Sequence, residues 1–96
     1  MSAMVGVAYG AEPILGVVKK AILRSIERDG FITPAAEAQV QRAVDLLKLE
    51  KCDPQHREQV EHISCTLREM HQWLLDGRVN AYASALLRLR RRVQAL

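Results

Sequence analysis

The sequence contains few aromatic residues and few cysteines, and both shortages limit what the chain can be. It has one Trp, two Tyr and one Phe in 96 residues, so the core has to be built from aliphatic side chains. Two cysteines cannot form the disulfide framework of a small secreted domain. The apolar start lacks the basic segment of a signal peptide and is too short to span a bilayer. These absences predict a soluble cytoplasmic protein with no membrane segment.

The residues that are present favour helices in one compact domain. Apolar residues make up 49% of the chain, which is ordinary for a globular protein, and 96 residues suit a single core. Leu, Ala, Val and Ile recur at helical spacing, and no run alternates as a strand would. We therefore expect residues 1–96 to form a single all-α domain.

Start and stop signals divide the chain into four predicted helices. Pro34 and Pro54 each follow a capping residue and suit the first position of a helix. Gly30 and Gly77 suit the position just after a helix end. Because the connection at Gly77 is very short, the last two helices should form an antiparallel hairpin in a four-helix bundle-like fold. The predicted order is a flexible arm at 1–11, then helices at about 13–29, 34–51, 54–76 and 79–95.

The stretch RDGFITPAAE, residues 28–37, resembles part of a calcium-binding EF-hand loop. If Gly30 takes position 6 of the loop, position 12 falls on Ala36, where the motif needs a bidentate Glu. Glu37 comes one residue too late. We therefore expect a helix stop followed by the helix start Thr33-Pro34, with no calcium site.

Metal and catalytic sites are also poorly supported. The four zinc-competent side chains follow the spacing C-x₃-H-x₅-H-x₂-C, which one continuous helix cannot bring to one ion; they are Cys52, His56, His62 and Cys65. A metal site there remains a third hypothesis.

A catalytic cysteine is not supported either. Cys65 has His62 and Glu69 one turn away on either side, but a helix interior offers no free backbone N–H to stabilise an oxyanion. Phosphate loops and hydrolase motifs are absent. We expect no enzymatic activity, no cofactor and no bound metal.

Two apolar features lie outside the predicted core stripes. Trp73 sits about 120–140° from the apolar stripe of its helix, at 100° per residue. We expect one of the first two helices to cover it; the alternative is that it anchors a partner, as Trp often does at interfaces. Leu46 and Leu49 point away from the apolar face of their own helix. Two such patches on a small domain favour a protein partner or a homodimer.

The end of the chain is basic. Residues 78–96 hold five arginines and no acidic residue, and Arg88, Arg91 and Arg92 project away from the apolar stripe. Cations at a helix C-terminus offset the helix dipole and keep its surface hydrated. They could also attract an acidic protein or nucleic acid. A helix-turn-helix at Gly77 is disfavoured because Trp73 occupies a position where a close helix crossing needs a small residue.

Together these features predict a non-enzymatic protein–protein interaction module. It would act as a small regulator, chaperone, anti-activator or inhibitor of another protein, alone or as a homodimer. The predicted anchors are Trp73, Leu46 and Leu49, and the predicted steering rim is Arg88, Arg91 and Arg92. The alternative is a nucleic-acid-binding transcriptional regulator that uses the C-terminal arginine cluster.

Overall fold

The computed structural model describes residues 12–49 and 54–96, and this part of the chain is helical and contains no strand. Its elements are α2 (Glu12–Asp29), α3 (Pro34–Leu49), α4 (Pro54–Leu75) and α5 (Val79–Gln94). Three helices begin at the predicted residue, and α2 begins one residue earlier. The predicted arm at 1–11 and the predicted end of the second helix at 50–51 lie outside the described residues. None of the four helices is both long enough and apolar enough to cross a bilayer.

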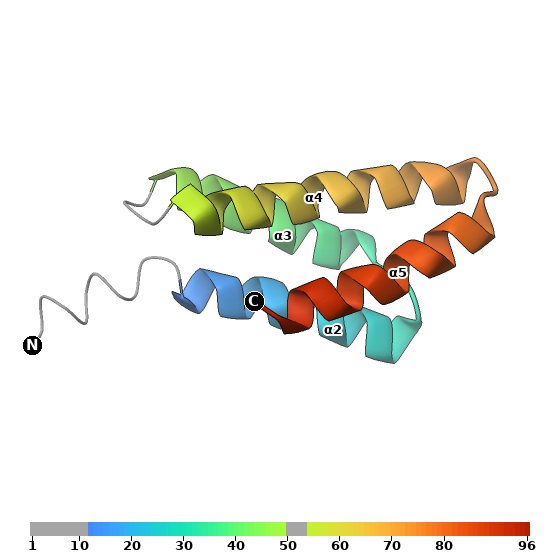
Figure 1. Cartoon of the computed structure of the whole chain (residues 1–96), viewed down its shortest axis with the longest axis horizontal. Helices are drawn as coiled ribbons and strands as arrows, with labels where there is room; N and C mark the ends of the chain where they lie inside the picture. Colours follow the sequence, from blue (N-terminus) through green and yellow to red (C-terminus); the bar gives the residue numbers. More distant parts are fainter. Residues whose placement is uncertain (1–11, 50–53) are drawn as a thin grey trace, which may run out of the picture.

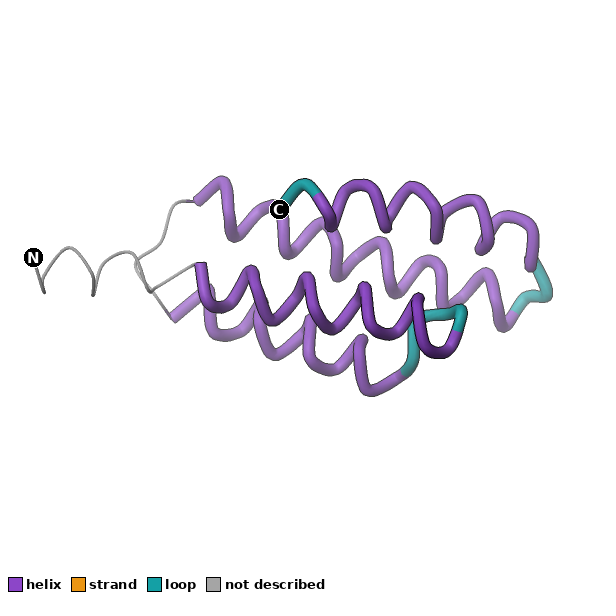
Figure 2. Tube along the Cα trace, turned by 90° about the horizontal axis from the view of Figure 1, so that it is seen from below, coloured by secondary structure: helices purple, strands orange, loops and turns teal. Residues whose placement is uncertain are grey.

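The helices run alternately in opposite directions and form a closed four-helix bundle (Figures 1 and 2). Each helix packs against the next one along the chain, and α5 returns to pack against α2. The predicted all-α fold with a C-terminal antiparallel hairpin is confirmed. Within that hairpin, α4 and α5 are closest at their connecting turn and diverge towards the opposite end of the bundle (Figure 1).

The core is aliphatic, as the shortage of aromatic residues requires. Ile22, Val40, Ile63 and Val93, one from each helix, have no exposed surface. Helical spacing places five apolar residues on one face of α3, and all of them are buried: Ala36, Val40, Ala43, Val44 and Leu47. Burying one branched aliphatic side chain contributes about 1.5–3 kcal/mol. These buried side chains therefore supply a large part of the favourable free energy that opposes the loss of chain entropy on folding.

The turn between α2 and α3 is held by hydrogen bonds from buried groups. Gly30, with a φ of 75°, donates its N–H to the Ile26 carbonyl at 3.0 Å, which closes the end of α2. The buried Ser25 hydroxyl donates to the Phe31 carbonyl at 2.7 Å and accepts from the Thr33 N–H at 2.9 Å. Thr33 Oγ1 in turn accepts the Ala36 N–H at 3.2 Å and caps α3. The segment is a helix stop and a helix start, as predicted.

The same turn is tied to the C-terminal helix. The Ile32 N–H donates to the hydroxyl of Tyr82 on α5 at 2.8 Å, in a buried position. Tyr82 is itself only 6% exposed. Its ring fills the core and its hydroxyl satisfies a backbone donor that would otherwise be buried without a partner.

The turn between α4 and α5 is a Schellman motif built on Gly77. The Arg78 N–H donates to the Trp73 carbonyl at 2.8 Å, and the Gly77 N–H donates to the Leu74 carbonyl at 3.1 Å. Gly77 has a φ of 78°, which a residue with a Cβ adopts only at a cost. The predicted stop at Gly77 is therefore explained by its backbone conformation.

Helical spacing places one further apolar residue of α2, of α4 and of α5 on the buried stripe of its helix, but all three side chains are exposed. Val17 on α2, Leu74 on α4 and Val79 on α5 are 52%, 41% and 60% exposed. For Leu74 and Val79 the reason is visible in Figure 1, where the end of the α4–α5 hairpin extends beyond the α2–α3 turn.

Candidate partner-binding surface

A surface depression between α4 and α5 brings three of the predicted binding residues together. We call it the α4–α5 hollow; its volume is about 230 Å³. It lies between residues 62–73 of α4 and residues 85–92 of α5, two helices that diverge from their common turn (Figure 1). Its walls are formed by His62, Thr66, Glu69 and Trp73 of α4 and by Ala85, Arg88, Leu89 and Arg92 of α5.

The α4 wall follows from helical spacing. His62, Thr66, Glu69 and Trp73 are separated by four, three and four residues, so they lie on one flank of the helix. The Thr66 hydroxyl is engaged, since it donates to the His62 carbonyl at 3.0 Å. Trp73 is partly buried and packs against the core. The Schellman motif that ends α4 also holds the backbone at Trp73, because the carbonyl of this residue accepts the Arg78 N–H.

Trp73 is oriented differently from what the sequence favoured. We expected one of the first two helices to cover it, but it lines the hollow together with residues of α5. The reason is the closed arrangement of the bundle, in which α4 packs against both α3 and α5 and makes only slight contact with α2. The flank of α4 that carries Trp73 is therefore the one that faces α5.

The α5 wall combines a buried floor with a charged edge. Ala85 and Leu89 are 4% and 3% exposed and belong to the core, whereas Arg88 and Arg92 are exposed. The two arginines are one turn apart, which is a rise of about 6 Å. Neither forms an ion pair or a side-chain hydrogen bond with any residue in 12–49 or 54–96. Arg91, the third predicted rim residue, is exposed but does not line the hollow.

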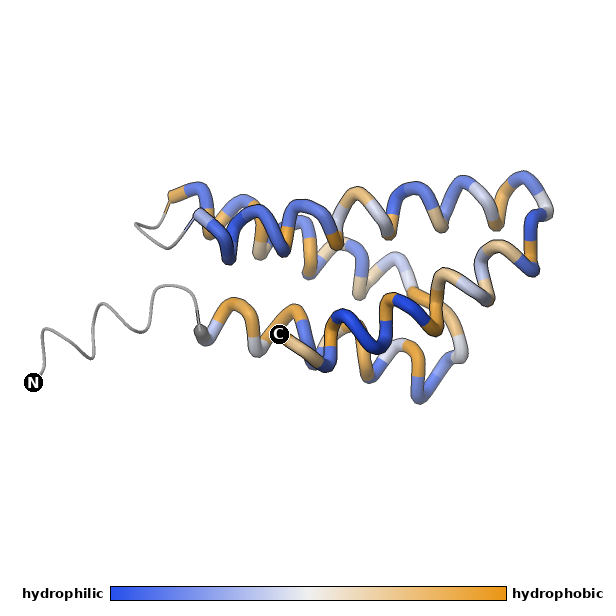
Figure 3. The backbone as a smooth tube through the Cα atoms, in the orientation of Figure 1, coloured by the Kyte–Doolittle hydropathy of each residue, from blue (hydrophilic) through white to orange (hydrophobic). Residues whose placement is uncertain are grey.

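The charge of the hollow is positive but not uniform. Arg88 and Arg92 stand on one side, and Glu69 is the single acidic residue among the residues that line it. Figure 3 shows that α5 is strongly hydrophilic close to its C-terminal end. The hollow thus offers an aromatic side chain beside two free guanidinium groups, which suits an anionic group attached to an apolar body.

The other two predicted anchors lie elsewhere. Leu46 and Leu49 on α3 are 44% and 83% exposed, so the prediction that they point away from the core is confirmed. Neither residue lines the α4–α5 hollow. The α4–α5 hollow and the Leu46–Leu49 pair are therefore two separate surfaces.

The zinc-competent residues are not brought together among the residues that the structure describes. Cys52 lies outside these residues. His62 lines the hollow, while Cys65 is exposed and its sulfur accepts a hydrogen bond from Arg68 at 3.3 Å. In residues 12–49 and 54–96, no group of three or more His, Cys, Asp or Glu side chains is arranged to hold a metal ion.

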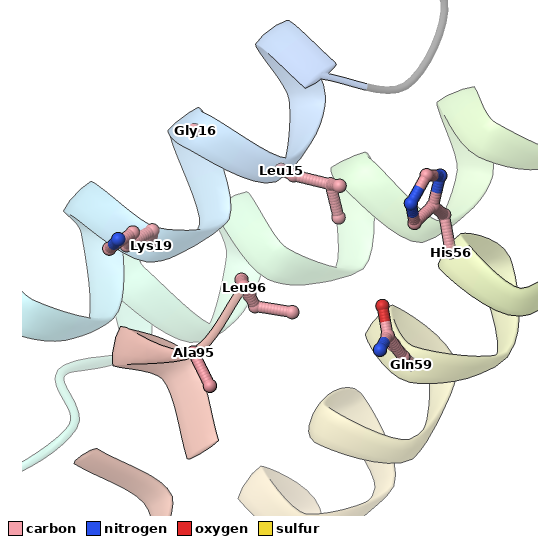
Figure 4. Close-up of a pocket in the computed structure, with 7 residues that line it drawn as sticks. All are labelled: Leu15, Gly16, Lys19, His56, Gln59, Ala95 and Leu96. Atoms are coloured by element: carbon pink, nitrogen blue, oxygen red, sulfur yellow. The ribbon is translucent and has the colours of Figure 1, made fainter. Parts of the chain in front are cut away.

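His56 belongs to a second depression, which the sequence did not indicate (Figure 4). This cleft of about 470 Å³ lies between α2, α4 and the end of α5. Leu15, His56, Gln59 and Leu96 reach it from these three elements (Figure 4). The His56 Nδ1 atom is buried there without a hydrogen-bond partner in the described part of the chain.

The sequence assigned a binding role to Trp73, Arg88 and Arg92. It did not assign one to His62, Thr66 and Glu69, which line the same hollow. His62, Thr66 and Glu69 share the helical spacing of Trp73, and that spacing was the available signal. It was not sufficient, because every helix has two flanks beside its core stripe. Only the position of the neighbouring helix shows which flank is paired with the arginines.

We compared the chain with protein-family models, with curated proteins and with solved structures, and none of the three comparisons found a match.

Proposed function

We propose that this chain is a non-enzymatic interaction module that binds another protein through the α4–α5 hollow. One observation carries the proposal: the partly buried Trp73 stands beside Arg88 and Arg92, which are exposed and unpaired within the described residues. Tryptophan and arginine are the side chains most often found at the energetic centre of interfaces. Exposed charges next to such an anchor speed association and select the partner.

The proposed consequence of binding is regulation, chaperoning or inhibition of the bound protein in the cytoplasm. Two cysteines are too few for the disulfide framework of a small secreted domain, which favours a reducing compartment. Leu46 and Leu49 would form a second contact, either with the same partner or with another copy of this chain. Exposed leucines on a helix face are suited to that purpose.

A nucleic-acid partner is less well supported by the distribution of charge. Nucleic-acid-binding domains carry lysine and arginine over a broad face. Here Arg88 and Arg92 form a strip on one helix, and α4 contributes Glu69 to the same hollow. The closely spaced phosphates of a nucleic acid bound in the hollow would be repelled by the Glu69 carboxylate.

The test is affinity capture from cells that naturally produce the protein, with the wild-type chain and three variants as baits. The first variant is Trp73→Ala, and the second is Leu46→Gln/Leu49→Gln. The third, Arg24→Gln/Arg28→Gln, is a control that removes two exposed arginines one turn apart on α2. Circular dichroism of each bait verifies that it is folded.

We expect at least one protein to bind the wild-type chain and the Arg24→Gln/Arg28→Gln control, and to bind again when both partners are purified. Trp73→Ala should weaken this complex about thirtyfold or more, which is the effect of losing a central tryptophan. The proposal is wrong if nothing is captured, or if all the baits capture the same proteins equally.

A further inference from the structure

The α4–α5 hollow continues into a longer groove along the same pair of helices. A neighbouring depression of about 290 Å³ shares His62 and Arg92 with the hollow. That depression shares Gln59 with the cleft at the far end of the bundle. We call the path from Trp73 to Gln59 the α4–α5 groove. It follows 15 residues of α4, whose 14 helical steps correspond to about 21 Å.

The two edges of the groove differ in charge. The α5 edge carries Arg88 and Arg92, whereas the α4 edge carries Glu69 and, further along, Glu58. Between the edges near Trp73, the floor is formed by Ala85 and Leu89, which belong to the core. The groove therefore has an apolar floor near Trp73, one basic edge and one edge of mixed polarity, and the depression beyond His62 is lined by polar side chains.

This pattern is complementary to an amphipathic helix with acidic residues along one side. Carboxylates four residues apart on such a helix repeat at about 6 Å, the same rise that separates Arg88 from Arg92. Both guanidinium groups are free to pair with them. An apolar side chain on the inner face of the ligand would contact Trp73 and Leu89, as in other helix-in-groove complexes.

We propose that the α4–α5 groove binds an acidic amphipathic helix of a partner protein, with its carboxylates on Arg88 and Arg92 and its apolar face on Trp73. The inference rests on the proposed function and specifies the chemistry of the partner. It also gives Glu58 and Glu69 a role. These acidic residues on the α4 edge repel a ligand helix whose carboxylates face α4 instead of α5. They thereby set the orientation of the ligand.

The probe is a synthetic helical peptide of about 15 residues, which matches the length of the groove. It carries two Glu residues four positions apart, Leu on the opposite face and no Trp. A second peptide has the same composition in scrambled order, so that the acidic residues no longer share a face. Trp73 is the only tryptophan in the chain, so its fluorescence reports occupation of the hollow directly.

We expect the first peptide to change the Trp73 emission in a saturable way, and added salt to weaken its binding. Arg88→Gln/Arg92→Gln should weaken binding roughly three- to thirtyfold, the range for two partly exposed ion pairs. The matched control Arg24→Gln/Arg28→Gln should bind like the wild type. Both variants keep Trp73 as the reporter.

The proposal is overturned if the first peptide does not bind saturably, if the scrambled peptide binds equally well, or if both arginine variants bind alike. It is also overturned if duplex DNA changes the Trp73 emission at a lower concentration than the peptide does. Light scattering tests whether a second copy of this chain occupies the groove. The proposal is overturned if the wild type is a dimer and Arg88→Gln/Arg92→Gln is a monomer.

Failure of this inference is distinguishable from failure of the proposed function. Arg88→Gln/Arg92→Gln is therefore added to the capture experiment as a further bait. A captured partner that Trp73→Ala weakens and this variant does not leaves the proposed function intact and overturns the acidic helix. If the peptide behaves as expected but no cellular protein is captured, the chemistry of the groove stands and the proposed function falls.

Discussion

At the residue scale, the buried hydroxyl of Ser25 is the group on which the first turn depends. We predict that Ser25→Ala lowers the free energy of unfolding by about 1–3 kcal/mol, because the Thr33 N–H and the Phe31 carbonyl both lose their partner. Urea titration followed by circular dichroism measures the change. The matched control is Ser84→Ala, an exposed position on α5, where alanine should be neutral or slightly stabilising. Equal midpoints for the two variants would contradict the prediction.

The orientation of single side chains is also where sequence reasoning reached its limit. The position of Trp73 outside the core stripe and the exposure of Leu46 and Leu49 follow from 3.6-residue periodicity. Periodicity gives only an angle about a helix's own axis. It cannot say that the flank carrying Trp73 faces α5, because that depends on the order of the helices around the bundle.

At the element scale, the backbone conformation of one glycine ends α4. A Cβ built on Gly77 meets no atom within 4 Å, so Gly77→Ala changes only the cost of a φ of 78°. We predict a loss of about 1–2 kcal/mol in unfolding free energy. Gly16→Ala is the matched control, since Gly16 lies within α2 and a Cβ there also meets nothing within 4 Å. It should gain about 0.5–1 kcal/mol. Thermal or urea unfolding checks both signs, and a loss at Gly16 as large as that at Gly77 would refute the explanation.

The bounds of the elements were predictable because capping is local chemistry. Thr33 and Pro34 start α3, and Gly30 and Gly77 follow the ends of α2 and α4, within a few residues of sequence in each case. The exposure of Leu74 and Val79 was not predictable in this way. It depends on how far the hairpin extends beyond the α2–α3 turn, which is set by the lengths of separate helices.

At the scale of the whole molecule, the contact of α5 with α2 closes the bundle and couples the first helix to the last. We predict that unfolding is cooperative. The transition seen by Trp73 fluorescence, which reports on the α4–α5 hollow, should coincide with the transition seen by far-ultraviolet circular dichroism, which reports on all the helices. Two separate midpoints would show that the hairpin and the α2–α3 pair unfold independently, and that the chain is not one cooperative unit.

The cleft in Figure 4 has a consequence for chain connectivity, because Leu15 near the start of α2 and Leu96 after α5 line the same space. A circular permutant can therefore join residue 96 to residue 12 through a short linker and place its new ends at Gly77. All four helices would keep their neighbours, but α4 and α5 would meet without a covalent turn. Comparing the folding rates of the permutant and the natural order would measure how much that local connection accelerates assembly of the bundle.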